Sequence, residues 1–129
     1  PWTDAPRPGA RAAGRSSRAG MIVRLWHGRV PAAKAGAYRE FLNRVAIPDY
    51  RAVPGNLDVR ILERAEDEVT HFVTLTTWTG WDAIRQFAGQ DLEAARYYPE
   101  DTDFLLEFEP RVAHYEVVGQ AEAGPGDPR

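Results

Sequence analysis

The sequence lacks cysteine altogether. Disulfide bonds, thiolate catalysis, iron–sulfur clusters and cysteine-ligated zinc are therefore excluded. The sequence also lacks any apolar run near the roughly 20 residues that span a bilayer, and its first residues lack the apolar stretch of a secretion signal. Its glycines are isolated rather than gathered in a phosphate-binding loop, so nothing supports a nucleotide or flavin site. These absences predict a cytoplasmic protein that binds no membrane and uses no cofactor.

The chain is acidic beyond its first twenty residues. Residues 1–20 hold four arginines against one aspartate, yet the whole chain carries a net charge of −3. An acidic body repels phosphate backbones, which argues against nucleic-acid binding. With 129 residues, of which 43% are hydrophobic, the chain has the size and composition of one globular domain.

Both ends of the chain are poor in large apolar side chains. Residues 1–20 are expected to form a disordered leader, either native or added in cloning, because they bury too little apolar surface to offset the entropy of ordering. Met21 directly precedes the first strand pattern and is a candidate natural start. Residues 119–129 are rich in Gly and Pro, which predicts a flexible tail. The folded domain is thus expected over residues 21–118.

Between these ends the pattern predicts the element order βαββαβ. Pro31 opens a helix whose apolar residues recur at helical spacing and which Pro48 should limit. Gly80 and Gly89 bound a second helix, and residues 92–98 are expected to add a further helical turn or two. The strands are expected at residues 21–30, 57–64, 70–78 and 111–118.

This order implies an α+β fold, a ferredoxin-like βαββαβ sandwich with a four-stranded antiparallel sheet in the order 4-1-3-2. Two helices on one face would leave the other face of the sheet open. Trp26, Tyr115 and other apolar residues occur on both faces of the predicted strands. We therefore expect a second copy of the chain to cover the open face, giving a homodimer.

Three stretches of the chain resemble the antibiotic biosynthesis monooxygenase superfamily, whose members form dimeric α/β barrels. The stretches are MIVRLWHGRV, VTLTTWTGWDAIRQFAG and YYPEDTDFLLEFEPRVAHYEVV, and the resemblance spans residues 21–118. It implies a cavity between the sheet and the helices. Members include cofactor-free oxygenases of aromatic polyketides, quinol-oxidising enzymes and haem-degrading enzymes. The Asn, Trp and His of the haem-degrading branch have no counterpart here, because the matching positions read WHGR, Phe87, and Arg96 or Tyr97.

The resemblance implies a cofactor-independent monooxygenase or quinol oxidase that acts on a small aromatic molecule. In the cofactor-free oxygenases the substrate itself is the reductant, since a deprotonated phenol or anthrone passes an electron to O₂. Arg24 is the candidate to hold a phenolate, and Tyr97 or His114 is the candidate to handle the proton. The expected aromatic wall of the substrate pocket comprises Trp26, Trp78, Trp81, Phe87 and Tyr98.

The three histidines support a different hypothesis. His27 lies late in the first strand, His71 early in the third and His114 early in the fourth. In an antiparallel 4-1-3-2 sheet these positions fall toward one end. A three-histidine catalytic metal centre is therefore an alternative, provided that the strand register brings the side chains to one face.

Two further interpretations need no catalysis. Trp78, Trp81 and Phe87 fit a plain hydrophobic core, because aromatic residues at such spacing usually fill space. A dimeric module that binds a small ligand without turning it over would use the same pocket and would need no proton-handling residue.

Overall fold

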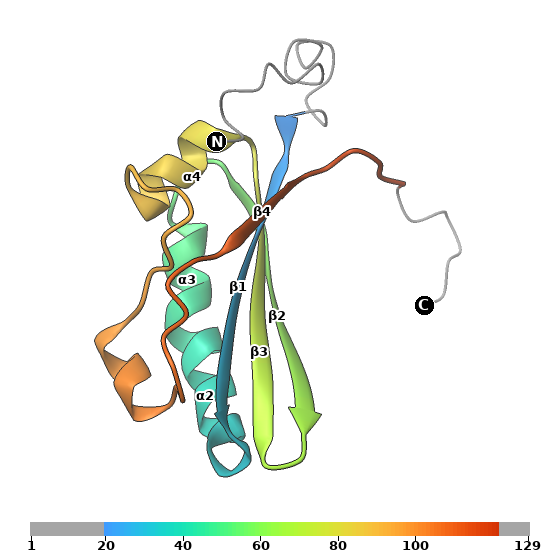
Figure 1. Cartoon of the computed structure of the whole chain (residues 1–129). Helices are drawn as coiled ribbons and strands as arrows, with labels where there is room; N and C mark the ends of the chain where they lie inside the picture. The colour runs from blue at the N-terminus through green and yellow to red at the C-terminus, as the bar shows by residue number, and fades with distance from the viewer. Residues whose placement is uncertain (1–19, 122–129) are drawn as a thin grey trace.

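The computed structural model describes residues 20–121 of the protein (Figure 1). The predicted leader, residues 1–20, lies outside the described residues except for its last position, and most of the predicted tail does too. The strands are β1 (Ile22–Pro31), β2 (Asn56–Glu66), β3 (Val69–Trp78) and β4 (Ala113–Glu116). The helices are η3 (Ala32–Lys34), α2 (Ala35–Phe41), η4 (Leu42–Ala46), α3 (Ile47–Arg51), α4 (Trp81–Ala88) and η5 (Pro99–Asp103).

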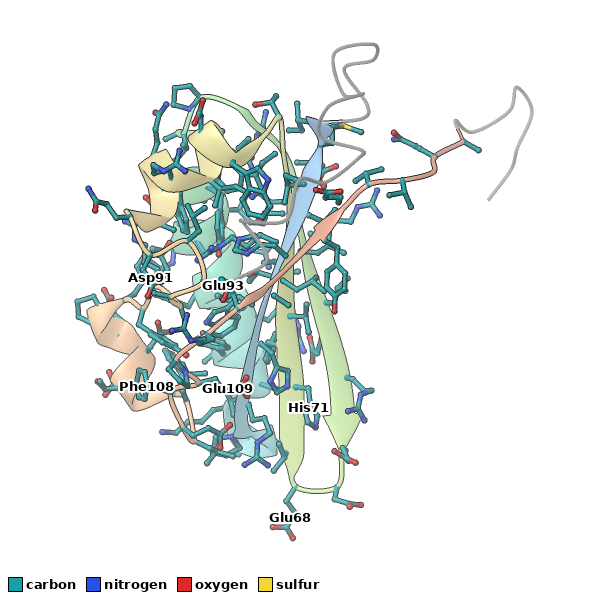
Figure 2. The ribbon with its side chains drawn as sticks, turned by 45° about the horizontal axis from the view of Figure 1, so that its top comes forward. Glu68, His71, Asp91, Glu93, Phe108 and Glu109 are labelled. Carbon is teal, nitrogen blue, oxygen red and sulfur yellow. The ribbon has the colours of Figure 1, made fainter. Side chains whose placement is uncertain are left out.

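The four strands form one antiparallel sheet in the order β2-β3-β1-β4. This confirms the predicted fold class and strand order. The β2–β3 hairpin turns at Asp67, which takes a positive φ of 57°, and Glu68 marks its tip (Figure 2). β4 is shorter than predicted and pairs with only the first part of β1, where His114 lies opposite Arg24.

The two faces of the sheet differ in burial. Along β1 and β3 buried and half-buried side chains alternate without exception, as the two-residue period of a strand requires. The buried face packs against α2, α3 and α4, which all lie on one side of the sheet (Figure 1). The half-buried face, called the open face below, carries these apolar side chains: Val23, Leu25, Leu62, Val73, Leu75 and Tyr115.

The first helical region continues past Pro48, so the prediction that Pro48 limits it is wrong. Proline lacks an N–H group, and its ring clashes with the carbonyl group four residues earlier in a regular α-helix. Here η4 is a π-helix, in which the Ile47 N–H donates to the Leu42 carbonyl. The wider π-turn re-aims the carbonyl groups just before the proline. The helix therefore runs on to Arg51 and buries Tyr50 against the sheet.

Residues 92–98 are not helical, so the prediction of a further helical turn there is also wrong. The carbonyl groups of Leu92 and Ala94 instead accept hydrogen bonds from the guanidinium of Arg24, at 2.7 and 3.1 Å. Arg24 is only 2% exposed, and a buried cation must find acceptors. The hydrogen bonds to Arg24 outweigh the helix propensity of this alanine-containing segment.

The core is built from one face of the sheet and from the helices that cover it. The buried apolar residues gather between the sheet and the helical layer, and they include Tyr38, Phe72, Trp78, Ile84 and Phe87. Of the helices formed by residues 20–121, none has the length and apolar character to cross a membrane.

Candidate functional site

A small cavity lies between the sheet and the helices α2 and α3. β1 and β3 contribute Trp26 and Thr74 to it, and the irregular segment after α4 contributes Arg96 and Tyr98. The rest of its lining is Tyr38, Leu42, Ala46, Tyr50 and Asp101. Its volume of about 10 Å³ admits roughly one water molecule. An aromatic ligand needs about 300 Å³ or more, so the cavity would have to widen to hold one.

The indole N–H of Trp26 is buried beside Tyr97. The side chain of Trp26 is 6% exposed, and its Nε1 makes no hydrogen bond of standard geometry among the described residues. Burial raises the pKa of Tyr97, yet the Tyr97 hydroxyl is close enough to Trp26 for that side chain to lower the pKa in part. Gly28 makes room for the Trp26 ring, because a Cβ atom at that position would come within 2.5 Å of it.

Two tyrosine–carboxylate pairs frame the cavity. The Tyr38 hydroxyl donates to Asp101 Oδ1 at 2.9 Å, and the Tyr98 hydroxyl donates to Asp49 Oδ2 at 2.7 Å. Burial, and then the adjacent carboxylate, raise the pKa of Tyr38. Burial and the hydrogen bond to Asp49 raise the pKa of Tyr98. Both hydroxyls therefore stay protonated and act as donors.

Asp101 is the buried carboxyl group of the cavity. It is 2% exposed, and burial raises its pKa. Its Oδ2 accepts the Tyr98 backbone N–H at 2.7 Å, which caps η5. A carboxyl group with a raised pKa is a stronger base than an exposed one, so Asp101 is suited to accept a proton inside the cavity.

Two arginines, of which Arg96 lines the cavity and Arg24 does not, share the aromatic ring of Phe87. The guanidinium carbons of Arg24 and Arg96 lie 5.5 and 4.5 Å from the centroid of Phe87, within cation–π range. The ring of Tyr50 stacks on Phe87 at 4.6 Å and also lines the cavity. Burial lowers the pKa of Arg24. This cluster keeps positive charge close to the cavity.

His114 accepts a hydrogen bond from Arg24 and does not line the cavity. Its Nε2 lies 3.1 Å from Arg24 Nη1, so the ring is neutral, with its hydrogen on Nδ1. Burial, and then the charge of Arg24, lower the pKa of His114 to about 4. The ring of Trp81 meets His114 at 5.2 Å. His114 thus helps to hold Arg24 in place.

The structure brings only part of the predicted site together. Trp26 and Tyr98 line the cavity, whereas Phe87 and Arg24 lie behind it. Trp78 is completely buried, with its indole N–H bonded to Thr76, as the plain-core interpretation predicts. The remaining predicted residues point elsewhere: Tyr97 donates its hydroxyl to the Glu109 carbonyl, and Trp81 and His114 form the cluster described above.

The three histidines do not converge. His27 and His71 meet on the open face, 2.9 Å apart, whereas His114 lies opposite Arg24 on the helix-covered face. Over residues 20–121 no group of three metal-ligating side chains is present. The alternative of a three-histidine metal centre is therefore wrong, because the register of β4 turns His114 to the other side of the sheet.

Sequence reasoning missed four residues that line the cavity. The place of Tyr50 at the cavity is missed because the sequence predicts that the helix stops near Pro48. The place of Arg96 is missed because the sequence predicts a helix there that does not form. Tyr38 and Asp101 are 63 residues apart, and no local pattern reveals their contact. A tyrosine in a helical stripe, which needs a partner for its hydroxyl when buried, was the available signal for Tyr38.

In sequence, the chain matches no family model and no curated protein. In structure, a Bacillus cereus protein assigned as an antibiotic biosynthesis monooxygenase aligns with a TM-score of 0.58 and 14% identity, over 81% of this chain and 99% of its own. A Streptomyces coelicolor monooxygenase solved with nanaomycin D aligns with a TM-score of 0.52 and 18% identity, over 84% of this chain and 96% of its own. SnoaB, a cofactor-independent oxygenase from Streptomyces nogalater, aligns with a TM-score of 0.50 and 16% identity, over 80% of this chain and 96% of its own. The fold is that of the antibiotic biosynthesis monooxygenases.

This finding confirms at the level of the fold the resemblance seen in the sequence. At identities of 14–18% the comparison concerns the fold alone.

Proposed function

We propose that this chain is a cofactor-independent oxygenase of the antibiotic biosynthesis monooxygenase family, acting on a small electron-rich aromatic substrate. The observation that carries the proposal is a cavity between the sheet and the helices that is lined by Trp26 and by Asp101, a buried carboxyl group whose pKa is raised by burial. The fold shared with SnoaB and the Streptomyces coelicolor monooxygenase supports the same class of reaction.

The proposed reaction needs only the substrate and O₂. Asp101 accepts the proton of a phenol or anthrone, and the Trp26 N–H donates to the resulting oxyanion. The positive charges of Arg24 and Arg96 favour the anion electrostatically. The deprotonated substrate reduces O₂, one oxygen atom enters the ring system as a carbonyl, and the other leaves as water. The substrate supplies the electrons, so the balance requires no flavin or metal.

Oxygen uptake tests this proposal. The full chain is mixed with anthrones, naphthols and hydroquinones in air-saturated buffer without added cofactor. We expect uptake with at least one class of substrate. Trp26→Phe keeps the ring and removes the donor, so kcat should fall about 10²-fold, as when one oxyanion donor is lost. Asp101→Asn should lower kcat by about 10²–10⁴-fold.

Arg85→Gln is the matched control. Arg85 pairs with Asp82 on the exposed side of α4, so this variant should keep the wild-type rate. Saturable binding of a phenol without oxygen uptake would favour the non-catalytic ligand-binding module instead. If the folded protein neither binds a phenol nor takes up oxygen, the oxygenase and the ligand-binding module are both refuted.

We also propose that the protein is a homodimer joined through the open face. Apolar side chains occupy its centre, and Tyr115 remains 58% exposed. The same face carries both signs of charge, with Arg60 and Arg64 beside Asp58 and Glu66 on β2. A face of this kind is self-complementary, which a two-fold interface between identical chains requires.

A further inference from the structure

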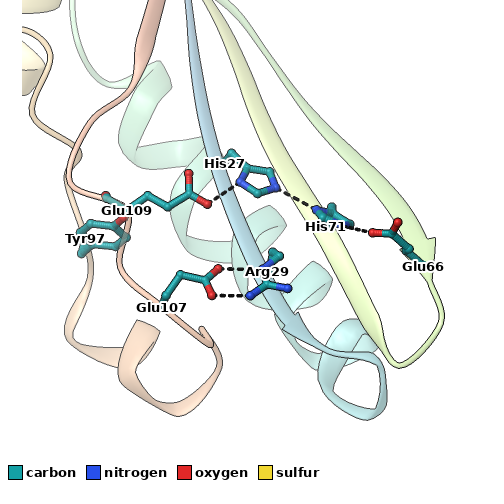
Figure 3. A network of polar contacts seen from close by, with 7 residues as sticks. All are labelled: His27, Arg29, Glu66, His71, Tyr97, Glu107 and Glu109. Carbon is teal, nitrogen blue, oxygen red and sulfur yellow. Dashed lines mark hydrogen bonds and ion pairs between the residues drawn. The ribbon is translucent and has the colours of Figure 1, made fainter.

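Four side chains form an unbroken chain of hydrogen bonds across the open face (Figure 3). Glu109 Oε2 lies 2.6 Å from His27 Nδ1, and His27 Nε2 lies 2.9 Å from His71 Nδ1. His71 Nε2 lies 2.7 Å from Glu66 Oε1. Strands β1, β2 and β3 and the segment before β4 supply these residues, which are far apart in the sequence but lie in one row across the sheet (Figure 3).

The hydrogen bonds of this row limit how many hydrogens the two imidazole rings can carry. Ionised carboxylates only accept, so the outer nitrogens, His27 Nδ1 and His71 Nε2, must each carry a hydrogen. Two neutral rings would then present bare lone pairs to each other at 2.9 Å, which is repulsive. The contact becomes a hydrogen bond only if a third hydrogen lies between the inner nitrogens. With that third hydrogen in place, the two rings together would carry one positive charge.

The charges around the pair match that count. Arg29 binds Glu107 through two hydrogen bonds of 3.0 and 2.7 Å. Arg64 Nη1 lies 3.8 Å from Glu66. With Glu109, three carboxylates thus face two guanidiniums, leaving one negative charge for a single proton to balance. Glu63, which borders the same hollow, is engaged on the other face by Arg39.

A metal ion fits the space less well than a proton. Zinc lies about 2.0–2.1 Å from each histidine nitrogen, in tetrahedral geometry. That geometry holds two nitrogens further apart than the 2.9 Å observed. The observed distance is that of an ordinary N–H···N hydrogen bond.

We propose that His27 and His71 form a site for one shared proton, which fastens the segment before β4 across the sheet. That segment also donates from the Leu106 N–H to the Arg29 carbonyl at 2.9 Å. The Glu109 carbonyl accepts from Tyr97, whose ring packs edge-on against Trp26 at 6.1 Å. The proton thus acts on the outer wall of the cavity through Glu109 and Tyr97.

The sign of the pH effect follows from the proton count. Two free imidazoles in an unfolded chain hold little proton above pH 7. The folded chain keeps one in the shared site. Because the folded state then binds more protons than the unfolded state, stability falls as the pH rises.

The proton is counted directly by NMR of the full chain with ¹⁵N-labelled histidine. At pH 7 we expect hydrogens on three of the four nitrogens of His27 and His71. Amide hydrogen exchange is then followed at Leu106 and its neighbours, corrected for the intrinsic pH dependence of exchange. Protection should fall at least 10-fold from pH 6.5 to 9. Neither readout requires catalytic activity, so the result is independent of the proposed oxygenase.

Two variants separate a shared proton from a merely structural contact. In His71→Asn the amide N–H stands at the Nδ1 position and donates to His27 without an extra proton, so protection should become independent of pH. In His71→Leu the donor is lost, and protection should be low at every pH. Arg85→Gln removes an exposed ion pair with Asp82 on α4 and should leave the wild-type pH profile unchanged.

Three outcomes would overturn the proposal. One is a count of only two ring hydrogens at pH 7. Another is wild-type protection that stays constant from pH 6.5 to 9. The third is stoichiometric zinc in the purified protein that shifts the His27 and His71 signals when a chelator removes it.

Discussion

At the scale of single residues, the interior of this protein holds several polar groups that are joined by hydrogen bonds. Arg24, Tyr38 and Asp101 are all nearly inaccessible, and each has at least one hydrogen-bond partner from a distant part of the chain. The resemblance seen in the sequence makes Arg24 a candidate to hold a phenolate. The sequence does not reveal its actual partners, because the main-chain carbonyls of Leu92 and Ala94 carry no residue-type signal.

His114 yields a prediction about acid stability. Its pKa is about 4 in the folded chain, below the ordinary value of about 6.5. Between pH 4 and 6.5, His114 is protonated in the unfolded chain but not in the folded chain. The free energy of unfolding therefore falls as the pH drops from 6.5 to 4. A difference of this size is worth on the order of 3 kcal/mol.

His114→Gln keeps an acceptor for Arg24 and cannot titrate. Its free energy of unfolding, measured with urea at several pH values, should therefore fall less steeply than that of the wild type over this range. Equal slopes for the two proteins would show that His114 titrates normally.

At the scale of elements, turns and helix irregularities shape the site more than the regular strands do. The strands follow from alternation and β-branched composition, and β1, β2 and β3 match their predicted bounds to within about two residues. The π-helix before Pro48 and the non-helical path of residues 92–98 were missed. Both arise from tertiary demands that override local preference, and together they place Tyr50, Arg96 and Tyr98 around the cavity.

Gly55 tests one of these turns. It adopts a φ of 94°, and a Cβ atom there would lie 2.4 Å from that of Ala83. Gly55→Ala combines backbone strain with a clash against α4, so we expect a loss of about 2–3 kcal/mol in urea unfolding. Gly36→Ala, within α2 and with only Arg39 Nη1 nearby at 3.9 Å, should instead stabilise by about 0.4–1 kcal/mol.

At the scale of the whole molecule, the proposed homodimer depends on the open face. The predicted antiparallel sheet with all helices on one side is confirmed, and it leaves the exposed side chains of Leu62 and Tyr115, 44% and 58% accessible, on the other side. The sequence could predict that such a face exists. It could not fix which residues form it, because that depends on the register between strands.

Leu62→Lys tests the proposed homodimer. A charge at the centre of the open face would be desolvated at a two-fold interface, so the variant should sediment as a monomer at concentrations where the wild type is a dimer. Arg44→Glu, an exposed change on η4 at the opposite surface, should leave the dimer intact. A wild-type protein that sediments as a monomer at high concentration would contradict the proposal.

The strand order also governs how this chain can fold during synthesis. β2 and β3 are joined by a tight hairpin and can pair as soon as both have been made. β1, which comes first, must wait for β3 about fifty residues later, and its other edge waits for β4, with Arg24 and His114 ninety residues apart. Until then β1 presents an unpaired edge, the feature of nascent chains that invites aggregation. The earliest strand is thus the last to be enclosed, and a ribosome-bound fragment that ends before β4 should depend on chaperones more than the finished protein does.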